Sequence, residues 1–251
     1  MCIDENPKAM LITGASGAIG SAIALASAQS GIALALACNS NVDAARTLCK
    51  TIVDQGCDAV VLQADISQAD ACKSLVADTL SRFGRLDILV NNAGFLRQQP
   101  FENIPLEELD FTFAVNLRAP FLLSQAAFAA MDQNSGGYIV NIASSGGQLG
   151  GPLAPHYAAS KAGLICLTKS LARLGAERNI ITHAISPGLI VTKMSEMEMA
   201  SEAGREKLRS IPAGRAGTPE EVAAMVLFAI SGKMDYASGQ TINLNGGLYM
   251  G

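Results

Sequence analysis

The chain has 251 residues, of which 49% are apolar and 16% are charged, and its formal net charge is −4. This acidic balance, without a basic patch, argues against nucleic acid or an anionic membrane surface as a partner. No stretch approaches the roughly 20 apolar residues of a membrane span, and no signal peptide precedes the first apolar run. We therefore expect a cytoplasmic protein whose length suits one large domain.

Seven apolar runs predict β-strands, and segments with helical periodicity lie between most of them. The predicted strands are residues 9–13, 32–38, 59–64, 86–91, 138–143, 181–186 and 240–244. Alternation of strand and helix is typical of right-handed βαβ units. The expected fold class is therefore α/β, as a single-domain, Rossmann-like, doubly wound parallel sheet with helices on both faces.

Residues 192–217 interrupt this alternation with a long polar segment. It ends at Thr218 and Pro219, a typical N-cap and first position of a helix, which Gly232 should terminate. Long inserts in compact α/β domains often cover a site, so we expect a substrate lid within a single domain spanning 1–251. Three methionines of the insert could give it an adaptable apolar surface or serve plain packing: Met194, Met197 and Met199.

Cysteine and histidine residues give no sign of a metal site. The six cysteines form no CxxC pair, which favours free thiols in a reducing compartment. His156 and His183 have no cysteine, carboxylate or histidine partner at ligand spacing in the sequence. We therefore interpret both histidines as structural residues and expect no metal.

The stretch TGASGAIG follows the first predicted strand and contains Gly14, Gly17 and Gly20. A strand that enters a helix through such a turn presents free backbone N–H groups to a pyrophosphate, and glycine allows the close approach. The spacing does not match G-x-G-x-x-G. By itself the turn therefore fits either a dinucleotide or tight packing of a strand against a helix.

Further motifs follow in a characteristic order. They are NNAG at 91–94, Asn116 within VNL, Ser144, YAASK at 157–161, SPG at 186–188 and NLNGG at 243–247. Together with the glycine turn, the chain resembles the short-chain dehydrogenase/reductase family over almost its whole length, and most of all its 3-oxoacyl-[acyl-carrier-protein] reductases. One position departs from the compact branch of that family, because Ala18 stands where T-G-x-x-x-G-x-G has glycine. We interpret the turn as a variant in which a small Cβ is tolerated beside the phosphates.

Tyr157 and Lys161 are four residues apart on a predicted helix, so their side chains share one face. A nearby ammonium favours the phenolate, so we expect Lys161 and a bound nicotinamide to lower the pKa of Tyr157, which acts as the general acid in carbonyl reduction. Ser144, at the end of the fifth strand, would hold the substrate carbonyl oxygen. The resemblance implies that Lys161 also binds the nicotinamide ribose and that Asn116 organises a water. Alone, a Tyr–Lys pair is commonly a surface pair; the accompanying motifs favour catalysis.

The residue after the second strand favours NADP(H), with NAD(H) as the alternative. NAD enzymes normally carry an acidic residue there to bind the ribose, whereas this chain has Cys38, and Asn39 and Ser40 can donate hydrogen bonds to a 2′-phosphate. The resemblance also implies cofactor contacts at Gly14, Ala15, Ser16, Gly17, Ile19, Gly20, Asp65, Ile66, Asn92, Ala93, Gly94, Tyr157, Lys161, Pro187, Gly188, Ile190 and Thr192.

The resemblance implies reduction of a 3-oxoacyl thioester with an acyl carrier protein as partner. Such a partner is acidic, yet residues 131–137 carry no basic side chain, although Arg173 and Arg178 remain as basic residues. A dehydrogenase of another small secondary alcohol, sugar, steroid or polyketide therefore stays open. A non-catalytic nucleotide-binding regulator is a further alternative, which normally lacks the Tyr or the Lys.

Apolar helices and an apolar C-terminus predict a homotetramer. The predicted helices 117–133 and 156–178 are rich in small and apolar residues, and Leu248, Tyr249 and Met250 follow the last turn. A monomer would expose these faces as a larger apolar patch than soluble monomers normally show. The family resemblance likewise implies a tetramer with two-fold interfaces.

Overall fold

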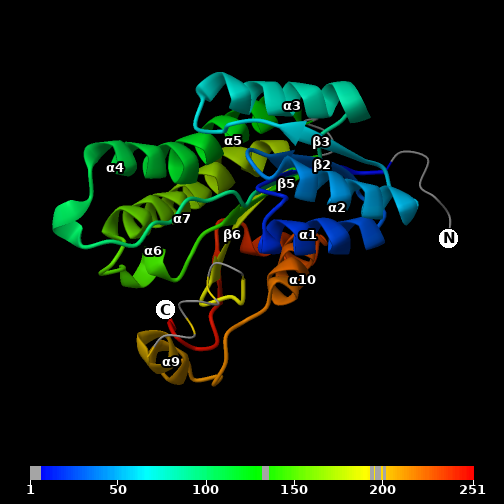
Figure 1. Cartoon of the computed structure of the whole chain (residues 1–251). Helices are drawn as coiled ribbons and strands as arrows, with labels where there is room; N and C mark the ends of the chain where they lie inside the picture. The colour runs from blue at the N-terminus through cyan, green and yellow to red at the C-terminus, as the bar shows by residue number, and fades with distance from the viewer. Residues whose placement is uncertain (1–6, 132–135, 193–194, 196–198, 200–201) are drawn as a thin grey trace.

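A computed structural model describes residues 7–131, 136–192, 195, 199 and 202–251 (Figure 1). Its sheet is parallel and has the strand order β3-β2-β1-β4-β5-β6-β7. The strands are β1 Ala9–Thr13, β2 Ala33–Cys38, β3 Ala59–Gln63, β4 Ile88–Asn91, β5 Gly137–Ile142, β6 Ile180–Pro187 and β7 Thr241–Leu244. The predicted fold class and each of the predicted strands are confirmed.

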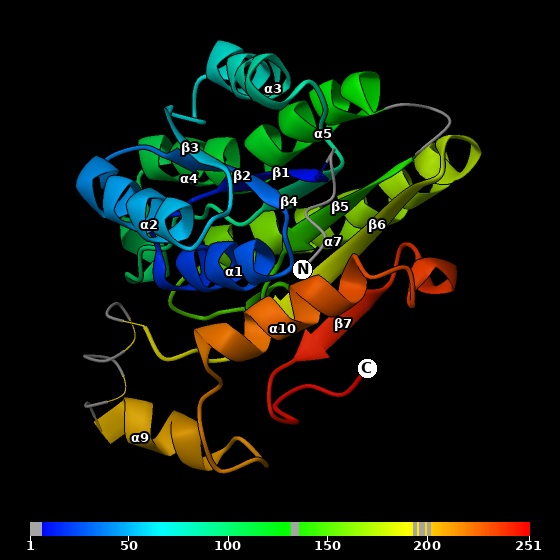
Figure 2. The same cartoon turned by 90° about the vertical axis from the view of Figure 1, so that its right-hand side faces the viewer.

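Helices cover both faces of the sheet (Figure 2). One face carries α1 Ala18–Gln29, α2 Val42–Asp54 and α10 Pro219–Ala229. The other carries α3 Ala69–Phe83, α5 Ala119–Ala130 and α7 Pro155–Gly175. Shorter helices are α4 Leu106–Phe113, α6 Gly146–Leu149 and α9 Glu202–Arg209, with 3-10 turns at Phe101–Asn103, Ala176–Arg178 and Asp235–Ala237. No helix in the described ranges is both long and apolar enough to cross a membrane.

The central strands are continuous apolar runs because both of their faces are buried. In β1, Met10 and Ile12 pack into the core beneath α1 and α10, whereas Leu11 packs into the core beneath α3 and α5. All residues of β1 and β2 are buried, while the edge strand β3 is only partly buried. This arrangement sets the carboxyl ends of the strands along one edge, where α/β proteins bind ligands.

Three helix boundaries differ from the sequence-based expectation. A π-helical segment, Ala114–Arg118, precedes α5, which itself ends at Ala130 rather than continuing to 133. Helix α7 ends at Gly175 and gives way to a 3-10 turn. Helix α10 ends at Ala229, ahead of Gly232, whose φ is +82°. Gly232 therefore completes the turn after the helix instead of capping it directly.

Thr218 is the N-cap of α10, as predicted, and it forms a capping box with Glu221. The Thr218 hydroxyl accepts from the Glu221 N–H at 3.3 Å, and the Glu221 carboxylate accepts from the Thr218 N–H at 2.9 Å. Just before it, a parallel bridge pairs Ile190 with Gly217. The two ends of the insert 192–217 are thus held side by side. Of its methionines, Met194 and Met197 lie outside the described residues, and Met199 is partly buried.

Candidate active site

The glycine turn between β1 and α1 is packed against the loop that follows β4. Gly14 has a φ of +66°, and a Cβ on it would lie 2.9 Å from the Ala93 Cα; a Cβ on Gly20 would overlap the Gly14 carbonyl oxygen. Gly17 differs, because a Cβ there would meet only that oxygen, at 3.4 Å. Ala18, the first residue of α1, is exposed to the cleft, so its methyl group is accommodated without displacing backbone.

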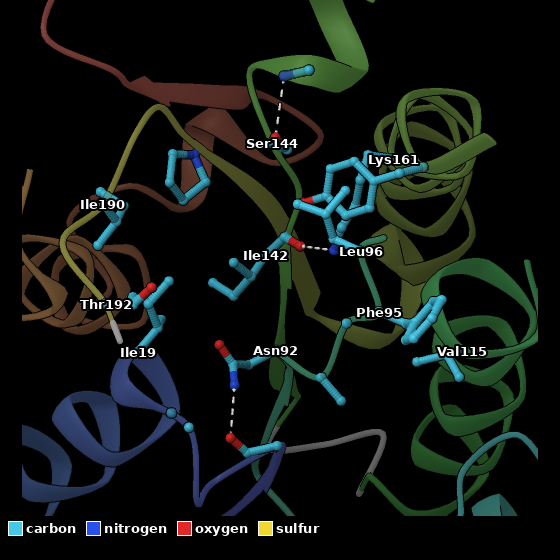
Figure 3. A pocket seen from close by; sticks show the side chains of 18 of the residues that line it. Ile19, Asn92, Phe95, Leu96, Val115, Ile142, Ser144, Lys161, Ile190 and Thr192 are labelled. Atoms are coloured by element: carbon cyan, nitrogen blue, oxygen red, sulfur yellow. Dashed lines mark hydrogen bonds between the residues drawn. The ribbon is translucent and has the colours of Figure 1, made fainter. Parts of the chain in front are cut away.

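A cleft of about 1600 Å³ runs along the carboxyl ends of the strands (Figure 3). Ile19, Ile190 and Thr192 lie on one side of it, and Phe95, Leu96 and Lys161 lie on the other. Nearly all of the predicted site residues line this cleft. They are Gly14, Ser16, Gly17, Ile19, Gly20, Asn39, Ser40, Asp65, Ile66, Asn92, Ala93, Gly94, Ser144, Tyr157, Lys161, Pro187, Gly188, Ile190 and Thr192.

Two predicted site residues do not line the cleft. Ala15 is fully buried in the core below the glycine turn, where its N–H donates to the Ala37 carbonyl at 3.0 Å. Asn116 is fully buried in the π-helical segment, and its amide clamps Phe95: Oδ1 accepts from the Phe95 N–H at 2.8 Å and Nδ2 donates to the Phe95 carbonyl at 2.9 Å. Nδ2 also donates to the Ser160 hydroxyl at 3.0 Å. The Asn116 amide is therefore already engaged within the protein.

Tyr157 and Lys161 meet at the floor of the cleft from one face of α7, as their spacing predicted. The Lys161 Nζ lies 5.8 Å from the centre of the Tyr157 ring and donates to the Ile142 carbonyl at 2.7 Å. Burial lowers the pKa of Lys161 from 10.5 to about 8. At neutral pH this ammonium is charged, although its environment is poorly solvated.

The expected lowering of the Tyr157 pKa concerns the enzyme with nicotinamide bound, and it stays a prediction for that state. In the cofactor-free chain, burial raises the pKa of Tyr157 above its ordinary value, and a hydrogen bond with the Ser144 side chain opposes this only in part. Removal of water disfavours the charged phenolate. Tyr157 is therefore a protonated phenol, and the Ser144 Oγ beside it also accepts from the Gly146 N–H at 3.1 Å.

At the far end of the cleft, the last residue of β2 is Cys38 rather than an acidic residue. Cys38 is 3% exposed, and burial raises the pKa of its thiol, with a smaller opposing effect from Arg46. The thiol is therefore neutral at pH 7. Asn39 and Ser40 follow it and are exposed to the cleft.

An apolar end of the cleft, opposite the glycine turn, was only partly foreseen from sequence. Leu149 ends α6 and Leu153 follows it in the loop before α7, and they are 53% and 55% exposed. Phe95 and Phe111 come from the loop after β4 and from α4, and their rings meet edge to face with centres 4.9 Å apart. Their positions in the sequence, Phe95 directly after NNAG and Phe111 shortly before VNL, could have indicated that they lie at the cleft.

Comparison with known proteins assigns the family. A family model described as "Enoyl-(Acyl carrier protein) reductase" matches residues 14–249. The chain belongs to the short-chain dehydrogenase/reductase family. It is 38% identical to the 3-oxoacyl-[acyl-carrier-protein] reductase FabG of Staphylococcus aureus, over 97% of this chain and 98% of the relative. It is 37% identical to the 3-oxoacyl-[acyl-carrier-protein] reductase of Synechocystis, over 96% of both chains.

Solved structures of the short-chain dehydrogenase/reductase family share the whole fold. The enzyme from Serratia marcescens BCRC 10948 superposes with a TM-score of 0.91 at 32% identity, covering 97% of this chain and 98% of its own. A blue fluorescent protein from a metagenomic library, solved with NADPH, gives a TM-score of 0.92 at 31% identity, covering 98% and 99%. The predicted enzyme class, an oxidoreductase of this family, is confirmed.

Proposed function

We propose that the enzyme reduces the 3-oxo group of an acyl-carrier-protein thioester to a secondary alcohol, with NADPH as the reductant. The observation that carries this proposal is the geometry around Tyr157: its phenol is hydrogen-bonded to the Ser144 side chain, and its ring centre lies 5.8 Å from the Lys161 Nζ. The phenol of the cofactor-free chain carries its proton, which a general acid must hold before it donates. The relatives named above support the carrier-linked thioester.

In this mechanism the protein holds the substrate carbonyl and delivers a proton to it. Ser144 Oγ accepts from the Gly146 N–H, and its O–H, which hydrogen-bonds to Tyr157 in the cofactor-free chain, would turn toward a carbonyl oxygen that enters the cleft. Tyr157 donates its proton to the same oxygen as negative charge develops there. The buried Lys161 ammonium then stabilises the phenolate, because an unscreened charge acts strongly at this range. Asn116 fixes the loop at Phe95, which borders this carbonyl site.

The glycine turn and the end of β2 fit a dinucleotide phosphate. Helix α1 has no side-chain cap at Gly17, so its first-turn N–H groups face the cleft, and helix N-termini of this kind attract phosphate. The neutral Cys38 thiol does not repel a 2′-phosphate, and Asn39 and Ser40 can donate to it. Related structures solved with NADPH and with NADP support this choice. NADPH, when bound, supplies the hydride.

The remaining cofactor contacts follow the cleft lining. Asp65 and Ile66 would border the adenine, and Asn92 to Gly94 the ribose. The nicotinamide end would lie at Pro187, Gly188, Ile190 and Thr192. In the present structure the Thr192 N–H donates to the Ser195 hydroxyl at 2.8 Å. Binding of a carboxamide at Thr192 therefore competes with this contact.

We further propose that the insert is a substrate lid of the single domain and that the enzyme is a homotetramer. Ser195 and Gly204 of the insert line the cleft, which supports the lid. Phe121 on α5 and Leu174 on α7 are 50% and 68% exposed, which supports a helix-mediated interface.

The test measures oxidation of NADPH and of NADH with acetoacetyl-acyl carrier protein, and separately with a 2-enoyl thioester. We expect turnover of the 3-oxo substrate with NADPH and a loss of about 100-fold or more in kcat for Tyr157→Phe, because the proton donor is gone. The NADPH affinity of this variant should stay within about twofold. Tyr236→Phe, at a fully exposed tyrosine, is the matched control. Turnover confined to the enoyl thioester, or full activity of Tyr157→Phe, would overturn the proposal.

A further inference from the structure

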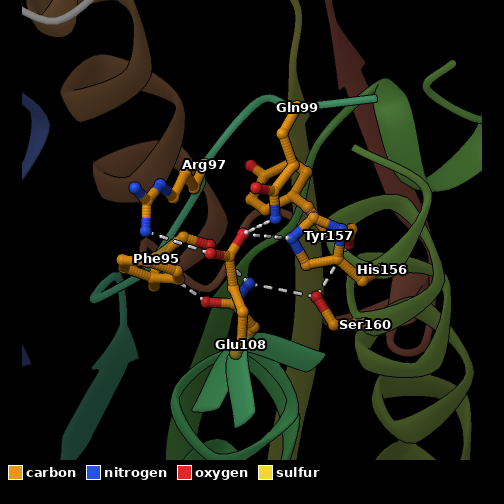
Figure 4. A network of polar contacts seen from close by, with 8 residues as sticks. Phe95, Arg97, Gln99, Glu108, His156, Tyr157 and Ser160 are labelled. Atoms are coloured by element: carbon orange, nitrogen blue, oxygen red, sulfur yellow. Dashed lines mark hydrogen bonds and ion pairs between the residues drawn. The ribbon is translucent and has the colours of Figure 1, made fainter. Parts of the chain in front are cut away.

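A buried carboxylate, that of Glu108 on α4, lies behind the wall of the cleft where three segments meet (Figure 4). Its Oε1 accepts from the Gln99 amide at 2.6 Å and lies 3.3 Å from the His156 Nε2. Its Oε2 accepts from the Arg97 guanidinium at 3.3 Å. The Glu108 side chain is only 7% exposed and that of His156 only 2%.

The segment Phe95–Gln99 forms that wall and is held at both ends. At Phe95 the Asn116 amide bonds both backbone groups. At Gln99 the backbone N–H donates to the Leu153 carbonyl at 2.9 Å, which joins the segment to the loop before α7. Between these anchors the Glu108 carboxylate holds the side chains of Arg97 and Gln99. The cleft-facing residues of both loops, such as Leu96 and Leu153, are therefore positioned from behind.

His156 links the same carboxylate to the catalytic helix. It lies in the first turn of α7, directly before Tyr157, and no regular hydrogen bond satisfies its ring in the described part of the chain. Its Nε2 therefore has Glu108 as its polar neighbour. The two carboxylate oxygens of Glu108 therefore contact both the first turn of α7 and the wall segment. This shared contact fixes the position of Tyr157 relative to the wall.

Simple core stability is a poor explanation for this arrangement. Burying a carboxylate costs free energy that its partners must offset, and an apolar side chain of similar volume is often at least as stable there. The partners also come from loops and a helix start rather than from the sheet. Each of them is the direct sequence neighbour of a residue that lines the cleft: Gln98 lies between Arg97 and Gln99, and Tyr157 follows His156. A polar hub of this kind fixes geometry rather than adding core stability.

We propose that Glu108 is a positioning residue for the reaction: it sets the wall Phe95–Gln99 and the start of α7 so that a substrate carbonyl is held against Tyr157. This inference rests on the proposed function only for the identity of the substrate. That Glu108 holds the two loops in place does not depend on which substrate the enzyme reduces.

The experiment compares Glu108→Gln with Glu107→Gln, its exposed neighbour on the same helix. A glutamine at 108 keeps the shape but offers one acceptor oxygen in place of two. We expect amide hydrogen exchange in peptides 95–99 and 149–154 to accelerate by about tenfold or more in Glu108→Gln, while the peptides of β1 and β4 keep their protection.

We also expect about a tenfold rise in KM for acetoacetyl-acyl carrier protein in Glu108→Gln, while its NADPH affinity stays unchanged. Global destabilisation would not change one of these quantities without the other. Gln99→Ala removes a partly exposed partner of Glu108 and should shift hydrogen exchange and KM in the same direction. It provides an independent test if Glu108→Gln fails to fold.

The two proposals fail in different ways. If the parent enzyme does not reduce the thioester, the proposed function fails, and hydrogen exchange alone decides the role of Glu108. If the parent is active and Glu108→Gln shows unchanged exchange or an unchanged KM, the positioning role is overturned. An equal response of Glu107→Gln overturns it as well, because the effect would then follow loss of charge rather than loss of the buried contacts.

Discussion

Replacing Lys161 by methionine should change how the stability of the protein depends on pH. Lys161 is buried at the floor of the cleft, and burial lowers its pKa from 10.5 to about 8. In the unfolded chain the lysine returns to its ordinary pKa. Below pH 8 both states are charged, and the folded state bears the full cost of the buried ammonium. Between pH 8 and pH 10.5 the folded protein releases the proton while the unfolded chain retains it, so the free energy of unfolding rises with pH.

The size of the effect follows from the shift. The shift of the Lys161 pKa from 10.5 to about 8 corresponds to roughly 3 kcal/mol between the two protonation states. Most of that difference is gained between pH 7 and pH 10. Methionine has a similar length, no charge and no proton to lose. The free energy of unfolding of Lys161→Met should therefore lack this rise with pH. Relative to the parent, the variant should be most stable at pH 7, where the parent bears the cost of the buried charge.

Urea unfolding of the cofactor-free protein at pH 7 and pH 10 measures the difference. Protein concentration is held constant, because the stability of an oligomer, which we propose this enzyme to be, depends on concentration. Lys50→Met, at an exposed lysine of α2, controls for the loss of one positive charge. The decisive quantity is the change in free energy of unfolding between the two pH values, compared across the three proteins. An equal change in the parent and in Lys161→Met would refute the reasoning, since the buried ammonium would then carry no desolvation cost.

Three further outcomes are expected. Gly20→Ala should destabilise the protein by about 1–3 kcal/mol in thermal unfolding, because its Cβ would overlap the Gly14 carbonyl oxygen, whereas Gly17→Ala should unfold close to the parent and lose NADPH affinity instead. Cys38→Asp should reverse the ratio of kcat/KM for NADPH and NADH through repulsion of the 2′-phosphate; a parent enzyme that prefers NADH would contradict the reading of this position. Deletion of residues 248–251 should reduce the mass measured by light scattering below that of a tetramer, and a parent that scatters as a monomer at micromolar concentration would rule the tetramer out.

The strands and the cleft could be predicted from sequence because both follow from local patterns. A buried parallel strand is a continuous apolar run, and the residue that follows it lies at the carboxyl edge of the sheet. These two facts place Gly14, Cys38, Asp65, Asn92 and Ser144 around one cleft. The four-residue spacing of Tyr157 and Lys161 similarly follows from helix geometry.

What sequence reasoning missed depends on burial and on contacts between distant segments. The raised pKa of Tyr157 in the cofactor-free chain follows from desolvation, which is set by elements that fold over the ring. The bonds of the Asn116 amide with the backbone of Phe95 likewise depend on how the π-helical segment packs against the loop after β4. The partnership of Glu108 with His156 joins residues of two different helices. No local periodicity reports such contacts, since they exist only after the loops have packed.

The bridge between Ile190 and Gly217 joins the two ends of the insert, so the segment between them can change in length with little effect on the rest of the fold. Its backbone bonds join the Val191 N–H to the Gly217 carbonyl and the Gly217 N–H to the Leu189 carbonyl, each at 2.9 Å, and the capping box of α10 follows immediately. A loop whose ends are already joined transmits little strain to the sheet when its length changes, and doubling its length costs only about 0.6 kcal/mol of closure entropy. On our proposal that the insert is a substrate lid, segments of other lengths grafted between these two points should change which substrates the cleft admits, while the sheet, the glycine turn and the Tyr157–Lys161 pair remain as they are.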